Sequence, residues 1–324
     1  MKVCVIGVGA IGGWMAAHLA NAGVDVSVLA RGATLAAIHA NGIRLHEAEK
    51  EIVVRVNASD DARALPTPDV LVLATKTTAL TSIIPQAKIL MGSQTTVVSA
   101  MNGVPWWFLA RAERALHGEA IAAVDRDGSI AKAVSALQVL GCVVHASASV
   151  SAPGCIQHRM GNKLIFGEAV GGASTRLNEI AVLFANAGYE TEASLDIQRD
   201  VWYKLWGNMT MNPISALTGV TMDKLLDDEY IRAWCSAIMA EANAVGTALG
   251  VPITQSADDR HAITRKLGAV RTSMLQDMQA GRVIELDALL SAVVELGGRV
   301  NVPMPSAQAL LGLTRVMARE RGLY

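Results

Sequence analysis

The chain has 324 residues, enough for two domains that each bury a core of their own. Hydrophobic residues make up 52% of the sequence, yet no uninterrupted apolar run approaches the roughly 18 residues that would indicate a membrane span. A formal net charge of −1 and the lack of basic clusters exclude the electrostatic footprint of a protein that binds nucleic acid or an acidic membrane.

The cysteines and the N-terminus bear on the compartment. Cys4, Cys142, Cys155 and Cys235 are scattered without a CxxC pair, which argues against structural zinc, disulfide frameworks and redox pairs. We expect buried thiols and no bound metal. No basic leader precedes the first predicted strand, so we expect a cytoplasmic protein whose partner is a small molecule.

The beginning of the chain predicts a strand, a tight turn and a helix in direct succession. Residues 3–6 form a short apolar run, GVGAIGG follows at 7–13, and an apolar helical pattern continues to Ala22. A GxGxxG motif in this place is typical of a dinucleotide-binding unit, although it also occurs in ordinary glycine-rich turns. A second predicted strand at the right distance favours the dinucleotide-binding interpretation.

Each residue of this turn has a defined part in such a unit. Gly7 permits the tight turn, Gly9 lets the backbone approach a pyrophosphate, and Gly12 lets the helix lie close to the strand. The N–H groups at the start of the helix, those of Ala10 and Ile11, would face the phosphates. We therefore expect these five residues to bind the cofactor.

The second strand indicates which dinucleotide is bound. The alternating stretch from Asp25 ends at Arg31, which should lie beside the adenosine ribose. A site that prefers NAD is expected to place Asp or Glu there, whereas the Arg31 guanidinium could pair with a 2'-phosphate. The motif favours NADPH over NADH. The alternative is that Arg31 is only a solvated charge at a strand end.

Strands and helices alternate up to about residue 190, which predicts an α/β domain. Residues 43–45 and 52–54 indicate a hairpin or edge pair, and residues 70–73 and 95–98 indicate buried parallel strands with a helical segment between them. Further strands are predicted at 120–124, 139–145, 163–166 and 189–191. A doubly wound sheet with an added antiparallel portion accounts for this pattern.

From about Leu195 onward, helical periodicity dominates and strand-like alternation nearly disappears. Breaks between helices are predicted at Gly219, 250–252, Gly281 and 297–298. We predict a Rossmann-like dinucleotide-binding domain at 1–193 and an all-helical domain at 194–324. A site built from both would lie in the cleft between them, next to the carboxyl ends of the strands.

Three polar residues in the stretch 202–213 share one face of a predicted helix. Lys204, Asn208 and Asn212 are spaced at i, i+4 and i+8. Tryptophan and methionine residues flank them, so an ammonium and two amides would project together from an apolar wall. The alternative is a solvated surface that bears a lysine and two asparagines, and the tryptophan-rich flanks weaken that alternative.

The ordered set of motifs resembles the ketopantoate reductase family (2-dehydropantoate 2-reductase) through almost all 324 residues. The resemblance rests on these features, in chain order: GVGAIGG at 7–13, Arg31, Lys76 after LVLAT, Asn102-Gly103, Pro153-Gly154 followed by His158, GNKLIFGE at 161–168, WYKLWGNMTMNP at 202–213, and Ser273-Met-Leu-Gln-Asp277 followed by Glu285-Leu-Asp287. The whole set is far more specific than its first motif.

By this resemblance, Lys204 takes the position of the family's general acid, which protonates the keto oxygen as NADPH delivers hydride to the keto carbon. The chemistry agrees, because ketone reduction builds negative charge on oxygen, which a placed ammonium both stabilises and protonates. Glu285 corresponds to the family's active-site glutamate, although an acidic residue in the first turn of a helix is favourable in any case.

The resemblance also implies binding residues. Asn208, Asn212 and Ser273 match positions that hydrogen-bond the substrate's hydroxyl and carboxylate. Lys76 and Asn102 follow consecutive parallel strands and match the lysine and asparagine expected beside the nicotinamide ribose and the substrate. Taken singly, Ser273 would be a helix surface residue, and Lys76 or Asn102 could be loop residues.

Some positions depart from the family pattern. Many relatives have a glutamine shortly after the lysine, whereas Lys76 is followed by Thr-Thr-Ala-Leu80, and Met101 stands where glutamine is common. An aromatic block at 106–108 either packs the domain junction or reshapes the pocket for another 2-keto acid. These differences leave cofactor binding intact and bear on the identity of the substrate.

The resemblance thus implies an NADPH-dependent reductase that converts ketopantoate to (R)-pantoate in pantothenate biosynthesis. The first alternative is a D-2-hydroxy-acid dehydrogenase of the same fold that acts on a different 2-keto acid. The second is a non-catalytic NADPH-binding sensor. The apolar surfaces of the helical domain could also support a homodimer.

Overall fold

The computed structural model describes all residues, 1–324, and they fold into two compact units. Unit 1 comprises Met1–Met101 and Ser129–Ile197, and unit 2 comprises Asn102–Gly128 and Gln198–Tyr324. Residues 102–128, which the sequence grouped with the strands, therefore lie with the helices. The predicted division of the chain into domains at 1–193 and 194–324 stays a prediction.

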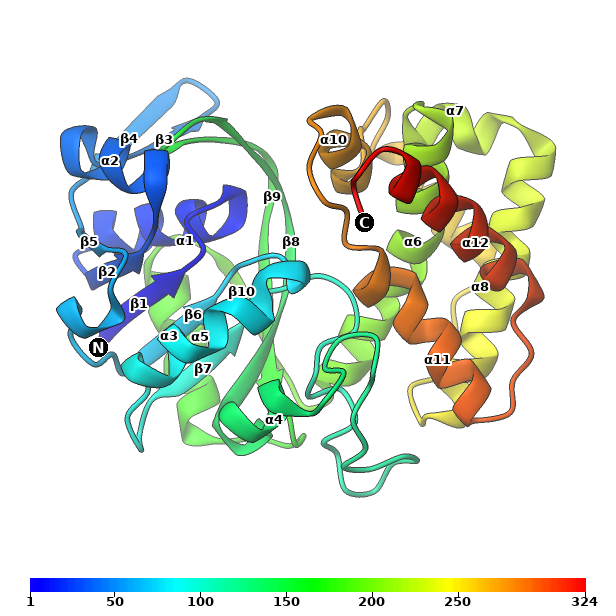
Figure 1. Ribbon diagram of the computed structural model, residues 1–324, viewed down its shortest axis with the longest axis horizontal. Coiled ribbons are helices and arrows are strands. Elements are labelled where there is room, and N and C mark those ends of the chain that lie inside the picture. The colour runs from blue at the N-terminus through cyan, green and yellow to red at the C-terminus, as the bar shows by residue number, and fades with distance from the viewer. The chain divides into compact units, whose positions relative to one another are not determined.

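Unit 1 is built around a ten-stranded mixed sheet (Figure 1). The strands follow the order β4-β3-β9-β8-β7-β6-β1-β2-β5, and β10 pairs with β9. Their bounds are β1 (Lys2–Ile6), β2 (Asp25–Leu29), β3 (Ile43–Glu47), β4 (Lys50–Val54), β5 (Asn57–Ser59), β6 (Val70–Leu73), β7 (Thr96–Ser99), β8 (Val139–Ala152), β9 (Cys155–Glu168) and β10 (Glu190–Ser194).

In the parallel part of the sheet, the order in which successive strands are added reverses at β1. This strand pairs in parallel with β2 on one side and with β6 on the other, and β6 continues through β7 to β8. All residues of β6 and β7 are buried, as expected of strands that are covered on both faces. The carboxyl ends of β1 and β6 mark the switch point at which sheets of this kind bind ligands.

The antiparallel portion predicted from the sequence is confirmed. Strands β3 and β4 form one hairpin, and β8 and β9, with 14 residues each, form a longer one. Strand β3 pairs in parallel with β9 and so joins the two hairpins.

Helices pack around the sheet within unit 1 (Figure 1). Their bounds are α1 (Ala10–Asn21), α2 (Gly32–Asn41), η1 (Ala62–Ala64), η2 (Thr77–Ala79), α3 (Leu80–Leu90), α4 (Ser129–Ala133), η3 (Ala136–Gln138) and α5 (Thr175–Asn186). Helix α1 is apolar along most of its length and is largely buried, and the glycine turn at 7–9 joins it directly to β1.

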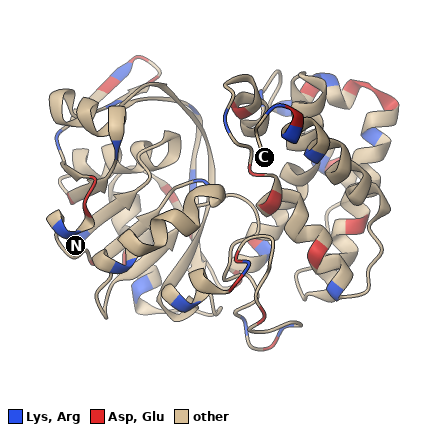
Figure 2. Cartoon of the chain, in the orientation of Figure 1, with Lys and Arg blue, Asp and Glu red and all other residues tan.

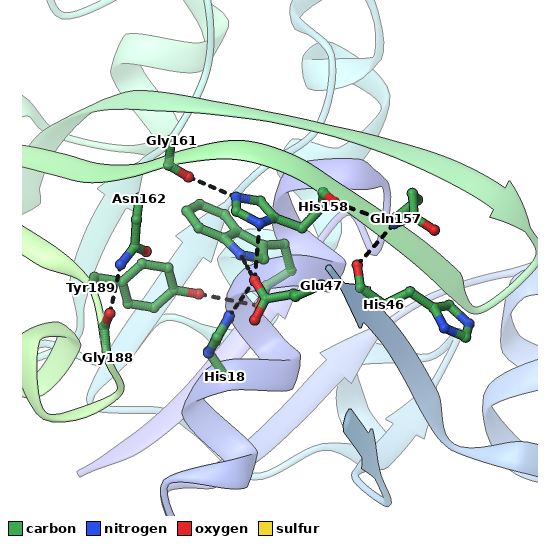
Figure 3. Close-up of polar contacts among 10 residues, drawn as sticks. His18, His46, Glu47, Gln157, His158, Gly161, Asn162, Gly188 and Tyr189 are labelled. Carbon is green, nitrogen blue, oxygen red and sulfur yellow. Dashed lines mark hydrogen bonds and ion pairs between the residues drawn. The ribbon is translucent and has the colours of Figure 1, made fainter. Parts of the chain in front are cut away.

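One carboxylate ties α1 to the sheet (Figure 3). Glu47 ends β3, and its Oε1 accepts a hydrogen bond from Trp14 Nε1 at 3.2 Å. The same oxygen lies 3.0 Å from Nε2 of His18, one turn further along α1, and 3.1 Å from Nδ1 of His158 on β9. Two residues of α1 and one residue of β9 thus converge on a single oxygen, which holds the helix against this part of the sheet.

Ring packing completes this cluster. Trp14 and His158 stack with their centroids 5.1 Å apart, and Tyr189 meets Trp14 edge-on at 4.7 Å. The Tyr189 hydroxyl donates to the Trp14 backbone oxygen at 3.2 Å, and burial raises the pKa of this phenol well above its ordinary value. No sequence spacing predicts the cluster, because its members lie on α1, β3 and β9 and ahead of β10.

Unit 2 is helical, as predicted (Figure 1). Its helices are α6 (Ile197–Thr218), α7 (Met222–Asp227), α8 (Glu229–Ala248), α9 (Ala257–Lys266), α10 (Ser273–Gln279), the π-helical turn η4 (Asp287–Ser291), α11 (Ala292–Arg299) and α12 (Pro305–Glu320). None of the helices is long and apolar enough to cross a membrane.

Two predictions about local structure are wrong. Residues 120–124 form turns instead of a strand, because two consecutive N–H groups there donate to the carboxylate of Glu295 at 2.8 Å each. Residues 297–298 do not break a helix but lie inside α11. A Cβ at Gly297 would lie 2.9 Å from Met304 Cγ, so this glycine allows close packing and does not end the helix.

The tryptophans of α6 lie in the core of unit 2. Trp202 Nε1 donates to the Ala242 carbonyl at 3.3 Å, and Trp206 Nε1 donates to the Met239 carbonyl at 2.7 Å. Both indoles therefore hold α6 against α8. The aromatic block at 106–108 is also buried, and Phe108 belongs to the same core as Trp202. Burial of such side chains explains why residues 102–128 lie with the helices.

Candidate functional site

The glycine turn after β1 has the close contacts that the motif predicts. Gly7 has a φ of 96°, and a Cβ there would lie 2.9 Å from the backbone of Ala74. A Cβ at Gly12 would overlap the carbonyl oxygen of Gly7. A Cβ at Gly9, in contrast, would meet no atom within 4 Å. Gly7 and Gly12 are thus needed for the fold, whereas Gly9 leaves open space beside the backbone.

The start of α1 can receive an anion. Gly9 is the N-cap residue and offers no side chain to the first N–H groups of the helix, which include those of Ala10 and Ile11. Such groups, together with the helix dipole, favour negative charge at this end. The open space at Gly9 lies at the same end, so the turn fits a pyrophosphate.

Arg31 lies just beyond the carboxyl end of β2. It is the N-cap residue of α2 and is exposed, with extended backbone angles. A guanidinium is a group that pairs well with phosphate. Lys76 follows β6 in the same way, is partly buried and precedes η2.

Lys204 and Asn102 come together within unit 2. The Lys204 ammonium donates to Asn102 Oδ1 at 2.7 Å, and the lysine is partly buried on α6. The sequence assigned Asn102 to the cofactor and Lys204 to proton transfer, and it gave no reason for direct contact across a separation of 102 residues. The amide oxygen accepts from the charged amine and so orients it.

The remaining predicted residues of unit 2 lie on α6, at the start of α10 and just ahead of η4. Asn212 Nδ2 on α6 lies 3.5 Å from Oγ of Ser273, the first residue of α10. Asn212 is 6% exposed, Asn208 is partly buried one turn before it, and Ser273 is exposed. Glu285 is partly buried two residues before the first residue of η4, and its backbone carbonyl accepts from the Leu289 N–H at 3.3 Å.

No group of three or more His, Cys, Asp or Glu side chains is placed to hold a metal ion. Cys4, Cys142 and Cys235 are buried free thiols, and Cys155 is partly buried. Burial raises the pKa of Cys4 to about 11 and that of Cys235 to about 12, which leaves both as unreactive thiols.

Charges of both signs are interspersed within each unit (Figure 2). In unit 2, a lysine ammonium, amide groups and a hydroxyl occur on α6 and α10, and a carboxylate precedes η4. These are groups that can bind and protonate a small polar substrate. With the dinucleotide turn of unit 1, they define an oxidoreductase that depends on a pyridine nucleotide.

Comparison with known proteins specifies the family. Residues 3–171 match the family model described as "Ketopantoate reductase PanE/ApbA", and residues 196–318 match the model of the C-terminal domain of the same family. A 2-dehydropantoate 2-reductase from Mesorhizobium japonicum is 43% identical over 325 residues, covering 100% of both chains. The chain belongs to the ketopantoate reductase family.

Solved structures support the same conclusion. A protein from Ralstonia solanacearum MolK2 that is assigned to the ketopantoate reductases shares 50% identity at a TM-score of 0.96, covering 100% of this chain and 99% of that one. A D-mandelate dehydrogenase solved with NADH and anilino(oxo)acetate has a TM-score of 0.86 at 18% identity, covering 99% of this chain and 100% of that one. The second likeness shows the fold alone.

Proposed function

We propose that the protein reduces ketopantoate to (R)-pantoate with NADPH, in the cytoplasm and as a step of pantothenate biosynthesis. The relative at 43% identity over the full length is named for this reaction. The observation that carries the proposal is the partly buried Lys204 ammonium, whose Nζ donates to Asn102 Oδ1 at 2.7 Å. Lys204 lies on a face of α6 that also bears Asn208 and Asn212.

The residues of unit 1 fit a dinucleotide. Gly9 leaves room for a pyrophosphate at the start of α1, and the N–H groups of Ala10 and Ile11 would donate to it. Arg31 would pair with the 2'-phosphate, which favours NADPH over NADH, and Lys76 would bind near the nicotinamide ribose. When bound, NADPH supplies the hydride that reduces the keto carbon.

Lys204 supplies the proton. Negative charge builds on the keto oxygen during reduction, and an ammonium beside it stabilises that charge and then donates the proton. Asn102 orients the amine, since its Oδ1 accepts one of the ammonium hydrogens at 2.7 Å. A positioned donor of this kind contributes about 10²–10⁴-fold to the rate.

Neutral polar groups would fix the substrate. Asn208, Asn212 and Ser273 present amides and a hydroxyl that suit the hydroxyl and carboxylate of ketopantoate. Glu285 would accept from the substrate hydroxyl or orient it. These roles follow the family's positions, and the contact between Asn212 and Ser273 supports the grouping of those two residues.

The test is replacement of Lys204. We expect Lys204→Ala to lower kcat for ketopantoate by about 100-fold or more, as befits loss of a general acid, while NADPH binding is retained. Lys224→Ala, which removes an exposed lysine from α7 of the same unit, is the matched control and should leave kcat unchanged. Equal turnover by the native enzyme and Lys204→Ala would refute the assigned role.

A panel of 2-keto acids addresses the alternative of a D-2-hydroxy-acid dehydrogenase. The aromatic block at 106–108 that raised this alternative is buried at 5% exposure or less, with Phe108 in the core of unit 2, so ketopantoate remains the favoured substrate. Reduction of a bulkier keto acid without turnover of ketopantoate would replace the assignment.

The homodimer also stays a proposal, which the molar mass measured by light scattering would test.

A further inference from the structure

The segment that follows Asn102 is docked onto η4 by its backbone. Gly103 has a φ of 85°, and a Cβ there would lie 2.6 Å from the Ala288 carbonyl oxygen and 2.7 Å from Ala288 Cβ. The next residue, Val104, donates its N–H to the same Ala288 oxygen at 2.8 Å. Both the backbone conformation and the lack of space therefore require glycine at position 103.

The π-helical turn explains why the Ala288 carbonyl accepts this bond. In an α-helix, the N–H of Ala292 would donate to Ala288. In η4 it donates instead to Asp287, one residue earlier, as the wider turn requires. The Ala288 oxygen is thereby freed from the helix ladder, and Val104 takes the place of the missing donor. The irregular turn and the docked segment thus form one hydrogen-bonded unit.

This docking bears directly on Lys204. Asn102 is the residue before the docked glycine, and its Oδ1 accepts from Lys204 Nζ at 2.7 Å. A displacement of a few tenths of an ångström at Gly103 moves the Asn102 side chain, because only one peptide unit separates the two residues. Glu285, the predicted active-site carboxylate, lies three residues before Ala288 and two residues before the first residue of η4.

We propose that Gly103, docked on the carbonyl that the π-helical turn frees at Ala288, is a positioning residue that sets the Lys204 amine for proton donation by way of Asn102. The inference rests on the proposed ketoreductase function and adds a positioning device to it. Gly103 does not touch the substrate, and its whole contribution passes through the Asn102 side chain.

The test is a double-mutant cycle measured with NADPH and ketopantoate. Gly103→Ala should lower kcat about tenfold or more in the native background, with NADPH affinity within about twofold of native. In an Asn102→Ala background, the same change should alter kcat by less than about twofold, because the residue through which it acts is gone. An equal loss of kcat in both backgrounds would overturn the proposal.

Gly118→Ala is the matched control. Gly118 lies in the same segment with a φ of 76°, but a Cβ there meets no atom within 4 Å. It carries a similar backbone strain without the contact, so kcat should stay at the native value. If Gly118→Ala lowers kcat as much as Gly103→Ala does, general strain in the segment explains the loss and the positioning role is rejected.

Two further measurements apply if Gly103→Ala does not fold or if the native protein reduces no 2-keto acid. If Gly103→Ala does not fold, Ala288→Val, which crowds the contact from the other side, replaces it in the cycle; failure of both to fold would show a purely structural contact and overturn the proposal. If the native protein reduces no 2-keto acid, the proposed function fails separately. A crystal structure of Gly103→Ala then decides: a Lys204–Asn102 separation beyond about 3.5 Å supports the positioning role, and an unchanged 2.7 Å rejects it.

Discussion

Alanine substitutions at Gly9 and Gly12, made one at a time, separate the folding of the glycine turn from its binding of the dinucleotide. A Cβ at Gly12 would overlap the Gly7 carbonyl oxygen and lie 3.0 Å from Ala74 Cβ, so α1 would have to move away from the turn. A Cβ at Gly9 meets no atom within 4 Å, and a φ of −88° is one that alanine adopts freely. We expect only Gly12→Ala to impair folding.

The magnitudes follow from these contacts. The methyl group at Gly12 meets backbone atoms that cannot rotate away, and overpacking of this kind costs about 1–3 kcal/mol. Since each kcal/mol lowers Tm by roughly 2–4 °C in a unit of this size, the expected decrease is about 2–12 °C. Gly9→Ala should change the free energy of unfolding by no more than about 1 kcal/mol.

Cofactor affinity should respond in a different order. The methyl group of Gly9→Ala occupies the space that the proposed pyrophosphate needs, and loss of one charge-assisted hydrogen bond costs about 1.5–3 kcal/mol. That cost corresponds to a Kd for NADPH that is roughly 10–100-fold higher. Gly12→Ala should weaken NADPH as well, because the displaced helix carries the phosphate-binding N–H groups with it.

Thermal unfolding followed by circular dichroism gives Tm, and fluorescence titration gives the Kd for NADPH. Either of two results would contradict these expectations. The first is a Gly9→Ala protein that binds NADPH as tightly as the native protein does. The second is a Gly9→Ala protein that loses as much stability as Gly12→Ala, since the space beside Gly9 would then not be open.

Arg31 and His261 allow two further tests, one of the cofactor's phosphate and one of the pH dependence of stability. Arg31→Ala should raise the Kd of NADPH about tenfold or more while changing that of NADH by less than about twofold, because only NADPH has the 2'-phosphate; equal weakening in titrations of both would mean that Arg31 does not read the phosphate. His261 is 3% exposed, its Nε2 lies 2.9 Å from Ser236 Oγ, and burial lowers its pKa. The unfolded chain therefore binds this proton more readily than the folded protein does. The free energy of unfolding should fall as the pH drops below about 6.5. Thermal unfolding between pH 7 and pH 5 should show a smaller decrease in Tm for His261→Gln, and an identical decrease in both proteins would exclude His261 as the cause.

Local sequence patterns determined much of the fold. Residues 3–13 predicted β1, the glycine turn and α1, because a strand of buried residues and a turn that needs glycine both leave marks within a few positions. The change to helical periodicity near residue 195 predicted the helices of unit 2 for the same reason. The spacing of Lys204, Asn208 and Asn212 placed all three on one face of a helix, which α6 confirms.

Contacts between distant residues were decided by the tertiary structure alone. Asn102 meets Lys204, and three side chains from two elements converge on Glu47, although no periodicity relates these positions. The turns at 120–124 arose where the sequence predicted a strand, because Glu295 from a distant helix accepts hydrogen bonds from two of their N–H groups. Periodicity reports which side of an element is buried, whereas the partner of a polar group depends on which elements pack together, and that is settled only when the whole chain has folded.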